Sequence, residues 1–247
     1  MSTAVPEPTT LVLLHGGRHG GWCWRPTADL VRAAGHQVLT PTLTGLGERA
    51  HLLDPGIGLD THVQDLVAVF EFEDLRDVVL VCHSYGGTVV ANAMERIADR
   101  VRSLVLLDAH LPLEGECVLD VIGPERAAHL LALAEREGEG WYVPPESAAR
   151  YGVTDPVTAA WADARLTAQP LRTYRDPCGP TDRAWRHPGM FIECTPSSLT
   201  PAQRERARAR SAADPAIAHR VLATPHNAMV TAPADLATLL LEVCAGE

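Results

Sequence analysis

One serine stands where a sharp turn would expose its hydroxyl. The stretch Asp77–Met94 reads D-V-V-L-V-C-H-S-Y-G-G-T-V-V-A-N-A-M, with Ser84 between a β-branched run at Val78–Val81 and helical apolar spacing over Thr88–Met94. A serine on a strand-to-helix turn projects its hydroxyl from the sheet edge, and small neighbours two positions away let the turn close as G-x-S-x-G. Here Cys82 replaces the first glycine. The stretch predicts a nucleophile elbow with Ser84 as nucleophile; the alternative is an ordinary turn with an incidental serine.

A base must take the proton of a serine hydroxyl before that hydroxyl becomes a good nucleophile. In an elbow architecture the base is a histidine in a loop after the last strand. His226 occupies that place, after the apolar run Ile217–Leu222. The chain has eleven histidines, so position and not residue type identifies the candidate. The alternative is an exposed loop histidine, and His83 is interpreted as a structural neighbour of the elbow.

The acid of a Ser-acid-His set is absent from its usual loop. The loop after the predicted strand Gly189–Thr195 reads T-P-S-S-L-T and contains no Asp or Glu. Losing the carboxylate interaction by an Asp-to-Asn change lowers turnover by about 10⁴-fold, so the absence matters. Asp108, at the end of the preceding strand, is a displaced candidate, and its other interpretation is a carboxylate that binds loop N–H groups. A third hypothesis is a Ser-His dyad oriented by Ser197 or water; Glu193 lies inside the strand and is a poor candidate.

A glycine-rich loop follows the first predicted strand, Thr10–Leu14, and reads H-G-G-R-H-G-G-W. It has neither G-x-G-x-x-G nor a Walker lysine, so a phosphate cradle is not favoured. Together with the elbow it is typical of an oxyanion loop. The predicted oxyanion donors are the backbone N–H groups of Gly17 and Tyr85, which would hold charge developing on a carbonyl oxygen. His15 and His19 are candidates for shaping the loop.

Strand and helix patterns alternate over most of the chain. Strands are expected at Thr10–Leu14, His36–Thr40, Val78–Val81, Val101–Leu107, Gly189–Thr195 and Ile217–Leu222. Helices are expected at Trp24–Ala34, from Asp60 or Thr61 to about Glu73, and at Thr88–Met94, Pro201–Ala212 and Ala228–Val243. This order predicts an α/β fold with a doubly wound, mostly parallel sheet, whose functional residues gather at the carboxyl ends of the strands.

Residues 111–187 break the alternation. They contain many prolines, several aromatic residues and two helical patterns, Glu125–Arg136 and Pro156–Thr167. Insertions of this kind commonly cover an active site. We therefore expect a single domain whose core comprises 1–110 and 188–247, with a cap at 111–187; the other interpretation is a packed structural excursion.

Composition restricts the function classes. The net charge of the 247-residue chain is −10, which argues against nucleic acid and anionic membranes as partners. There is no lysine to act as base or Schiff-base former. Six scattered cysteines show no metal spacing, and neither a signal peptide nor a membrane span is expected, so a cytoplasmic location is predicted. No metal or organic cofactor is expected, and association as a homodimer stays open. The arginines of 201–212 are interpreted as a solvated face.

These motifs resemble the α/β-hydrolase superfamily, specifically the plant methylesterase and hydroxynitrile lyase branch and its bacterial relatives. The strongest segments are Leu11–Trp24, Val79–Gly87 and Pro225–Met229. The resemblance extends over most of the chain and is loose in the cap. It implies an α/β-hydrolase fold. It also implies that Ser84 is the nucleophile and His226 the base, and that Gly17 and Tyr85 are the oxyanion donors.

Two positions separate the chemistries of this branch. The lyases carry Thr where this chain has Gly16, and Lys where it has Asn227. Both differences favour hydrolysis of an ester or lactone over cyanohydrin cleavage. Two departures from the family pattern remain, Cys82 in the elbow and Ser197 where the family's Asp is expected.

Three hypotheses follow. The first is a serine hydrolase that cleaves a carboxylic ester or lactone of a small, largely apolar substrate through a Ser84 acyl-enzyme, with His226 as base. The second is a non-hydrolytic enzyme on the same fold, such as a cyclase, lyase or epimerase of a biosynthetic intermediate. The third is a ligand-binding protein without turnover. Fold alone does not choose among them.

Overall fold

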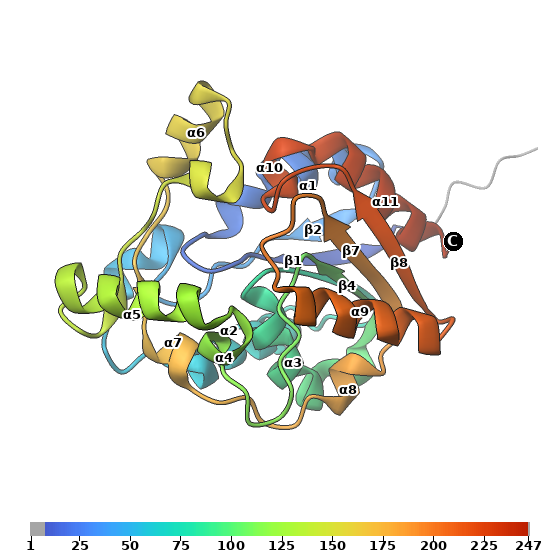
Figure 1. Cartoon of the computed structure of the whole chain (residues 1–247). Coiled ribbons are helices and arrows are strands. Elements are labelled where there is room, and N and C mark those ends of the chain that lie inside the picture. The colour runs from blue at the N-terminus through green and yellow to red at the C-terminus, as the bar shows by residue number, and fades with distance from the viewer. Residues whose placement is uncertain (1–7, 247) are drawn as a thin grey trace, which may run out of the picture.

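Aliphatic runs between polar turns form a central sheet in the computed structural model, which describes residues 8–246 (Figure 1). The strands of this sheet are β1 (Thr10–Leu14), β2 (Gln37–Leu39), β3 (Val78–His83), β4 (Val101–Leu107), β7 (Gly189–Cys194) and β8 (Ile217–Leu222). They lie in the order β2-β1-β3-β4-β7-β8, and every neighbouring pair is parallel. The predicted parallel α/β sheet is confirmed.

Helices cover both faces of the sheet (Figure 1). The helices that pack on the sheet are α1 (Arg25–Ala33), α2 (Leu59–Phe72), α3 (Gly86–Ile97), α9 (Pro201–Ala213), the short α10 (Ala228–Thr231) and α11 (Pro233–Ala245). Successive strand residues point to opposite faces, so the central strands β1, β3 and β4 contribute to two cores. Leu13 and Val81 pack in the core that α1, α10 and α11 cover. Leu14 and Leu80 pack in the other, against α2 and α3.

Residues 111–187 run between β4 and β7. They contain α4 (Val118–Val121), α5 (Pro124–Glu137), β5 (Tyr142–Val143), α6 (Pro156–Asp163), β6 (Gln169–Pro170), α7 (Arg172–Arg175) and α8 (Asp182–Trp185). β5 and β6 form an antiparallel pair of their own. In Figure 1, α5 and α6 stand at the left and the top, outside the central sheet. The remaining elements are the 3₁₀ helices η1 (Gly21–Trp24), η2 (Gly47–Leu52), η3 (Ala98–Arg100) and η4 (Ala148–Tyr151).

Element types were predicted better than element ends. The helix expected to be capped by Asp60 or Thr61 begins slightly earlier, with Gly58 at its N-cap and the Thr61 hydroxyl accepting from the Gly58 N–H. The helix expected at Ala228–Val243 is two helices, separated at Ala232 before Pro233. Proline lacks an N–H and restricts the residue before it, so it starts a new helix here instead of continuing one.

The arginines of α9 do not form a purely solvated face, and that prediction was wrong. Arg208 donates to both carboxylate oxygens of Glu193, at 3.0 and 2.7 Å, and Glu193 is only 1% exposed. Arg206 pairs with Glu116, and the Arg210 guanidinium lies 5.4 Å from the ring centre of Trp185. The alternating arginine pattern could not reveal these partners, because they come from distant segments of the chain.

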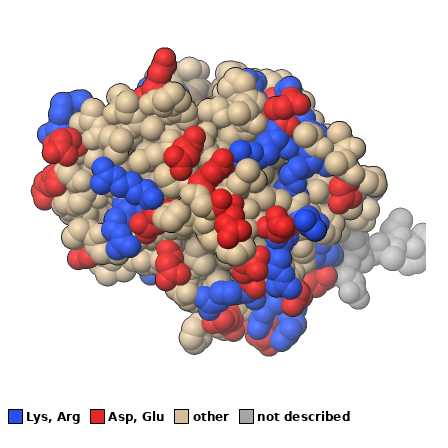
Figure 2. Space-filling model, turned by 60° about the horizontal axis from the view of Figure 1, so that its bottom comes forward, with Lys and Arg blue, Asp and Glu red and all other residues tan. Residues whose placement is uncertain are grey.

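The surface carries charges of both signs. On the face shown in Figure 2, arginines and carboxylates are interspersed, and no large area carries one sign alone. None of the helices within residues 8–246 has the length and apolar character that a bilayer crossing requires.

The two phenylalanines of α2 offer a matched test of the core. Phe70 is fully buried, whereas Phe72 is 88% exposed. Replacing Phe70 with Ala removes a packed ring and leaves a cavity, so we expect the free energy of unfolding to fall by about 3–5 kcal/mol in denaturant titrations. Phe72→Ala on the same helix should change it by less than about 0.5 kcal/mol. Equal effects would show that the register of α2 on the sheet is wrong.

Candidate active site

Ser84 occupies a left-handed backbone position between β3 and α3, with φ of +52°. Its N–H donates to the carbonyl of Leu107, and its own carbonyl accepts from Gly87 and His110 at 3.0 and 2.9 Å. A Cβ on Gly87 would lie 2.3 Å from the His110 carbonyl oxygen, so only glycine fits there. These contacts hold the serine in a conformation that is unfavourable for a residue with a side chain.

The replaced first glycine of the elbow does not prevent the turn. Cys82 lies within β3 and is fully buried, and the tight side of the turn is formed by the glycines that follow the serine. A Cβ at Gly86 would lie 3.4 Å from the Cys82 Cβ and 2.9 Å from the His15 carbonyl oxygen. Absence of a side chain at position 86 therefore leaves room for the cysteine.

Asp108 and His226 form a buried pair. The Nδ1 of His226 lies 2.5 Å from Oδ2 of Asp108, and the two residues are 3% and 0% exposed. A carboxylate accepts, so Nδ1 carries a proton and donates it, which leaves Nε2 free to accept one from another group. Asp108 lies directly after β4, and His226 lies in the loop after β8. The fold thus brings together two residues separated by 118 positions.

The loop after β7 binds this carboxylate. Ser197 donates its hydroxyl to Oδ1 of Asp108 at 2.5 Å, and the Ser198 N–H donates to Oδ2 at 3.2 Å. Ser197 therefore contacts the acid and not the imidazole, which argues against the dyad in which Ser197 orients His226. Asp108 thus contacts a loop N–H group as well as the histidine, a geometry that fits both interpretations of this residue.

These contacts determine the charge of Asp108. Burial alone would raise the pKa of its carboxyl, but the hydrogen bond and charge of His226, with the hydrogen bonds from Ser197 and Ser198, hold it below its usual value. Asp108 is consequently a carboxylate at neutral pH. Its backbone has φ of +40°, another strained position at the sheet edge.

The histidine loop is fixed by His83. Burial keeps the pKa of His83 well below its usual value, with His226 and His19 adding to the effect, so its ring is neutral. Its Nε2 donates to the backbone carbonyl of His226 at 3.0 Å, in agreement with the predicted structural role. A residue of the elbow thereby holds the loop that carries the histidine.

The glycine-rich loop presents its backbone to the serine. Among residues 8–246, the N–H groups of Gly17 and Tyr85 donate to no backbone acceptor and to no side chain. The Gly17 carbonyl accepts from Nδ1 of His19 at 2.8 Å, and Nε2 of His19 lies 3.2 Å from the side-chain nitrogen of Asn227. Burial lowers the pKa of His19 to about 3, so the ring is neutral and can accept at Nε2. His15, similarly, contacts Gly16 at 2.7 Å. The two histidines shape the loop as expected.

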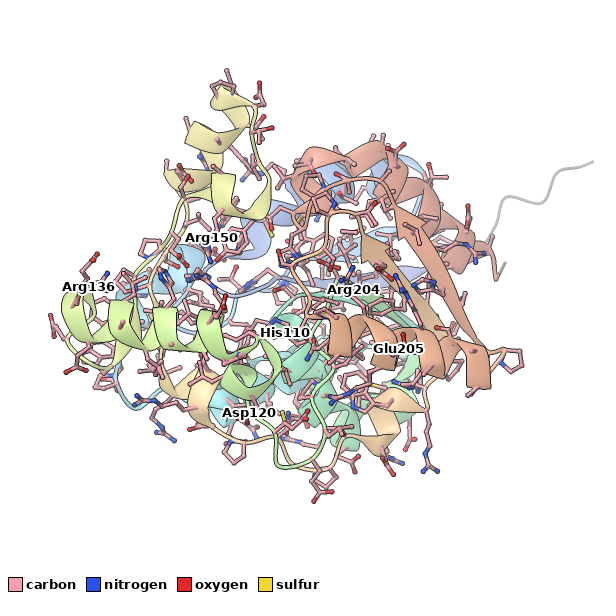
Figure 3. All side chains as sticks on the ribbon, in the orientation of Figure 1. His110, Asp120, Arg136, Arg150, Arg204 and Glu205 are labelled. Carbon is pink, nitrogen blue, oxygen red and sulfur yellow. The ribbon has the colours of Figure 1, made fainter. Side chains whose placement is uncertain are left out.

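A cavity of about 420 Å³ joins these residues. Ser84 and His226 both line it, as do Gly17 and Tyr85. The inserted segment closes its other side with Val118, Ile122, Arg126, Leu130, Arg150, Tyr151 and Tyr174. Figure 3 shows His110, which also lines it, near the centre of the molecule between α5 and α9.

Sequence reasoning missed several lining residues. His110 follows Asp108 by two positions, and its place at the end of β4 was a usable signal. Arg18 lies inside the glycine-rich motif, whose pattern is defined by its glycines and gives no role to the residues between them. Arg126 and Arg150 belong to the inserted segment, whose pattern did not reveal which side faces the cavity. Among the described residues, no cluster of His, Cys, Asp or Glu is arranged to hold a metal ion.

Comparisons with known proteins agree with this geometry. A family model described as "Alpha/beta hydrolase family" matches residues 11–239. The carbendazim hydrolyzing esterase of Nocardioides sp. (strain SG-4G) is 42% identical over 176 residues, 67% of this chain and 71% of that protein. Methylesterase 10 of Arabidopsis thaliana is 27% identical over 254 residues, 95% of this chain and 91% of that protein. An extracellular alpha/beta-hydrolase from a Paenibacillus species matches with a TM-score of 0.81 at 21% identity, covering 95% of this chain and 98% of that chain, a likeness of fold.

The depressed pKa of Asp108 predicts a pH-dependent stability. The unfolded chain binds a proton at this carboxyl more readily than the folded chain does. The contribution of the carboxylate to the free energy of unfolding is therefore complete above the unfolded pKa, near 4, and is lost as pH falls through the folded pKa. We expect Asp108→Asn to lower the free energy of unfolding by about 1.5–3 kcal/mol at pH 7, because it removes hydrogen bonds to a charged group. The gap between wild type and variant should narrow below pH 4. A gap that stays constant from pH 7 to pH 3 in denaturant titrations would contradict the lowered pKa.

Proposed function

The chain belongs to the alpha/beta hydrolase family and is an esterase-type enzyme, and we propose that it hydrolyses a carboxylic ester or lactone through an acyl-enzyme on Ser84. The observation that carries the proposal is the buried Asp108–His226 pair, whose histidine lines the same cavity as the serine. It supports a Ser-His-Asp set in which the acid comes from the end of β4 and not from the loop after β7.

In the first half of the reaction, Oγ of Ser84 attacks the carbonyl carbon of the ester while Nε2 of His226 takes the hydroxyl proton. The carbonyl π electrons move to oxygen, and the N–H groups of Gly17 and Tyr85 stabilise the resulting oxyanion. Asp108 holds the imidazole through Nδ1 and stabilises the positive charge that the ring gains. Collapse of the intermediate breaks the bond to the alcohol, which leaves with the proton from Nε2.

In the second half, water replaces the alcohol. Nε2 of His226 takes a proton from water as its oxygen attacks the acyl carbon, and the oxyanion forms again between the same donors. Collapse then breaks the bond to Ser84 and returns the proton to its hydroxyl. One ester and one water become one carboxylic acid and one alcohol. No metal or organic cofactor takes part.

The relatives support hydrolysis over the alternatives. The Nocardioides protein is named an esterase and the Arabidopsis protein a methylesterase. The non-hydrolytic hypothesis rested on the missing acid, and Asp108 beside His226 removes its main motive. At Gly16, where the lyases carry Thr, a Cβ would lie 2.8 Å from Nδ1 of His83 and 3.0 Å from the Ser84 Cβ. A branched side chain would displace the elbow, which is a further argument for ester or lactone cleavage.

The lining favours a small substrate with an apolar part. Val118, Ile122 and Leu130 bring aliphatic side chains to the cavity, and Tyr174 lies over Gly17, where a Cβ would come within 2.2 Å of its hydroxyl. Apolar walls of this kind bind hydrocarbon, and a few polar groups orient the reacting bond.

The proposal predicts burst kinetics with an activated short-chain ester such as p-nitrophenyl acetate. Rapid acylation of Ser84 followed by slower deacylation should release about one equivalent of p-nitrophenol before the steady state. Ser84→Ala should abolish the burst and lower turnover by at least about 10³-fold. Ser211→Ala, a serine of α9 outside the cavity, is the control and should behave as wild type. Steady hydrolysis that survives in Ser84→Ala would remove the acyl-enzyme from the account.

A further inference from the structure

Three guanidinium groups line the cavity that contains Ser84 and His226, and no carboxylate lines it. They come from Arg18 in the glycine-rich loop, Arg126 on α5 and Arg150 in η4. Within residues 8–246, the lining thus has three fixed positive charges and no negative one. We propose that these arginines form an anion subsite, and that the preferred substrate is an ester that carries a free carboxylate besides the bond to be cleaved. This inference rests on the proposed esterase function of the same cavity.

Nearby carboxylates do not balance these charges. Glu146 is the carboxylate that contacts all three arginines, at 2.9 Å from Nη1 of Arg18, 3.0 Å from Nη1 of Arg126 and 3.4 Å from Nε of Arg150. No other carboxylate of the described residues lies within 4.0 Å of their guanidinium groups. One negative charge facing three positive ones leaves two uncompensated. His129, which also contacts Glu146, adds no negative charge.

Glu146 itself stays ionised. Burial would raise its pKa, but the hydrogen bond from Arg126 and the charges of Arg18 and Arg126 lower it to about 2. Its carboxylate therefore keeps its single negative charge at any physiological pH and stays paired with the arginines. An additional anion has to come from outside the protein.

Arg18 is buried, and the contacts within the cluster do not satisfy all of its hydrogen-bond donors. Its side chain is among the most buried charges of the protein, with the residue 5% exposed, yet its Nε–H has no partner within residues 8–246. An unpaired buried donor is costly, and more so on a charged group. Its backbone is also held in the left-handed region, with φ of +63°, and its N–H donates to Gln169 at 2.8 Å. The loop thus keeps a buried, incompletely bonded guanidinium at the cavity wall.

Arg150 supplies a second unused set of donors. The nearest approach of Arg150 to Glu146 is made by Nε at 3.4 Å, the Arg150 side chain is 47% exposed, and no hydrogen bond joins its Nη atoms to the described residues. Figure 3 shows Arg150 above α5, on the side of α6, whereas Arg136 lies at the far end of α5. The planar fork of arginine matches the two oxygens of a carboxylate. The aliphatic side chains of Val118 and Leu130 line the same cavity and suit the hydrocarbon that would join the carboxylate to the ester.

The test compares two substrates of nearly equal shape. One is the monomethyl ester of adipic acid, which has a terminal carboxylate; the other is the corresponding methyl ester with a terminal primary amide. We expect wild type to prefer the carboxylate by about 10- to 100-fold in kcat/KM, the range for charge-assisted hydrogen bonds. Raising the salt concentration should reduce the preference, because added ions screen the arginines.

Variants assign the preference to the cluster. Arg126→Gln and Arg150→Gln should each lower the ratio of the two kcat/KM values by about tenfold. Arg136→Gln is the matched control, since Arg136 is on the same helix as Arg126 but is paired only with the exposed Glu137. It should leave both activities and their ratio unchanged. A ratio near one in wild type, with both esters cleaved, would overturn the anion subsite.

A binding measurement separates this proposal from the esterase function. Adipate and adipamide are titrated calorimetrically into Ser84→Ala, which cannot acylate. If adipate binds more tightly than adipamide and Arg150→Gln weakens its binding, the anion subsite is supported. This holds even if neither ester is hydrolysed, because missing hydrolysis would refute only the proposed esterase function. The subsite would be refuted if the two compounds bound with equal affinity, or if adipate bound more tightly and Arg150→Gln did not reduce the difference. Either result would refute the subsite even if hydrolysis of the esters supported the esterase function.

Discussion

The hydrogen bond between Asp108 and His226 is the interaction on which the rest of the site depends. It fixes the proton on Nδ1, so Nε2 of His226, a residue that lines the cavity, is left free to accept another. Without an adjacent carboxylate the ring would be free to adopt either tautomer. The fold makes the bond with an acid from an unexpected strand, because β4 lies between β3, which leads to Ser84, and β7. Parallel neighbours end at one sheet edge, so moving the acid by one strand keeps it near the histidine.

The position of Asp108 also accounts for the residues of the loop after β7, which contains no carboxylate. Ser197 and Ser198 stand where a carboxylate was expected, and they donate hydrogen bonds to Asp108. In this chain their loop supplies hydrogen-bond donors to the carboxylate instead of carrying one. These hydrogen bonds offset the free-energy cost of removing the carboxylate from water, since a buried charge is tolerated when it is paired and hydrogen-bonded.

Local patterns predicted much of the fold and the strand-to-helix turn that carries Ser84. The positions of the strands, the turn at Ser84 and the glycine-rich loop that contains Gly17 follow from residue types at short spacing. The pairing of Asp108 with His226 could only be offered as one of three alternatives, because it joins residues that are far apart in the chain. The arginine partners were beyond prediction for the same reason. Which side of α5 faces the cavity depends on tertiary packing, so Arg126 looked like any surface charge.

Charge within the cavity runs against the charge of the whole chain. The protein has a net charge of −10, yet arginines alone supply the charged groups that line its cavity. Glu146 of the inserted segment pairs with Arg18 of the glycine-rich loop and with Arg126 of α5, so a contact that joins the segment to the loop also sets the charge of the cavity wall. Low-dielectric walls focus such a field on a bound molecule.

The most direct test of this account is the rate at which a fluorophosphonate probe labels the protein, with the modified residue identified by peptide mass spectrometry. The account requires a single adduct on Ser84 in wild type, and labelling slower by about 10³- to 10⁴-fold in Asp108→Asn, because the imidazole then loses its orienting carboxylate. Equal labelling rates in the two proteins would contradict the role of Asp108, and an adduct elsewhere or none at all would contradict the role of Ser84.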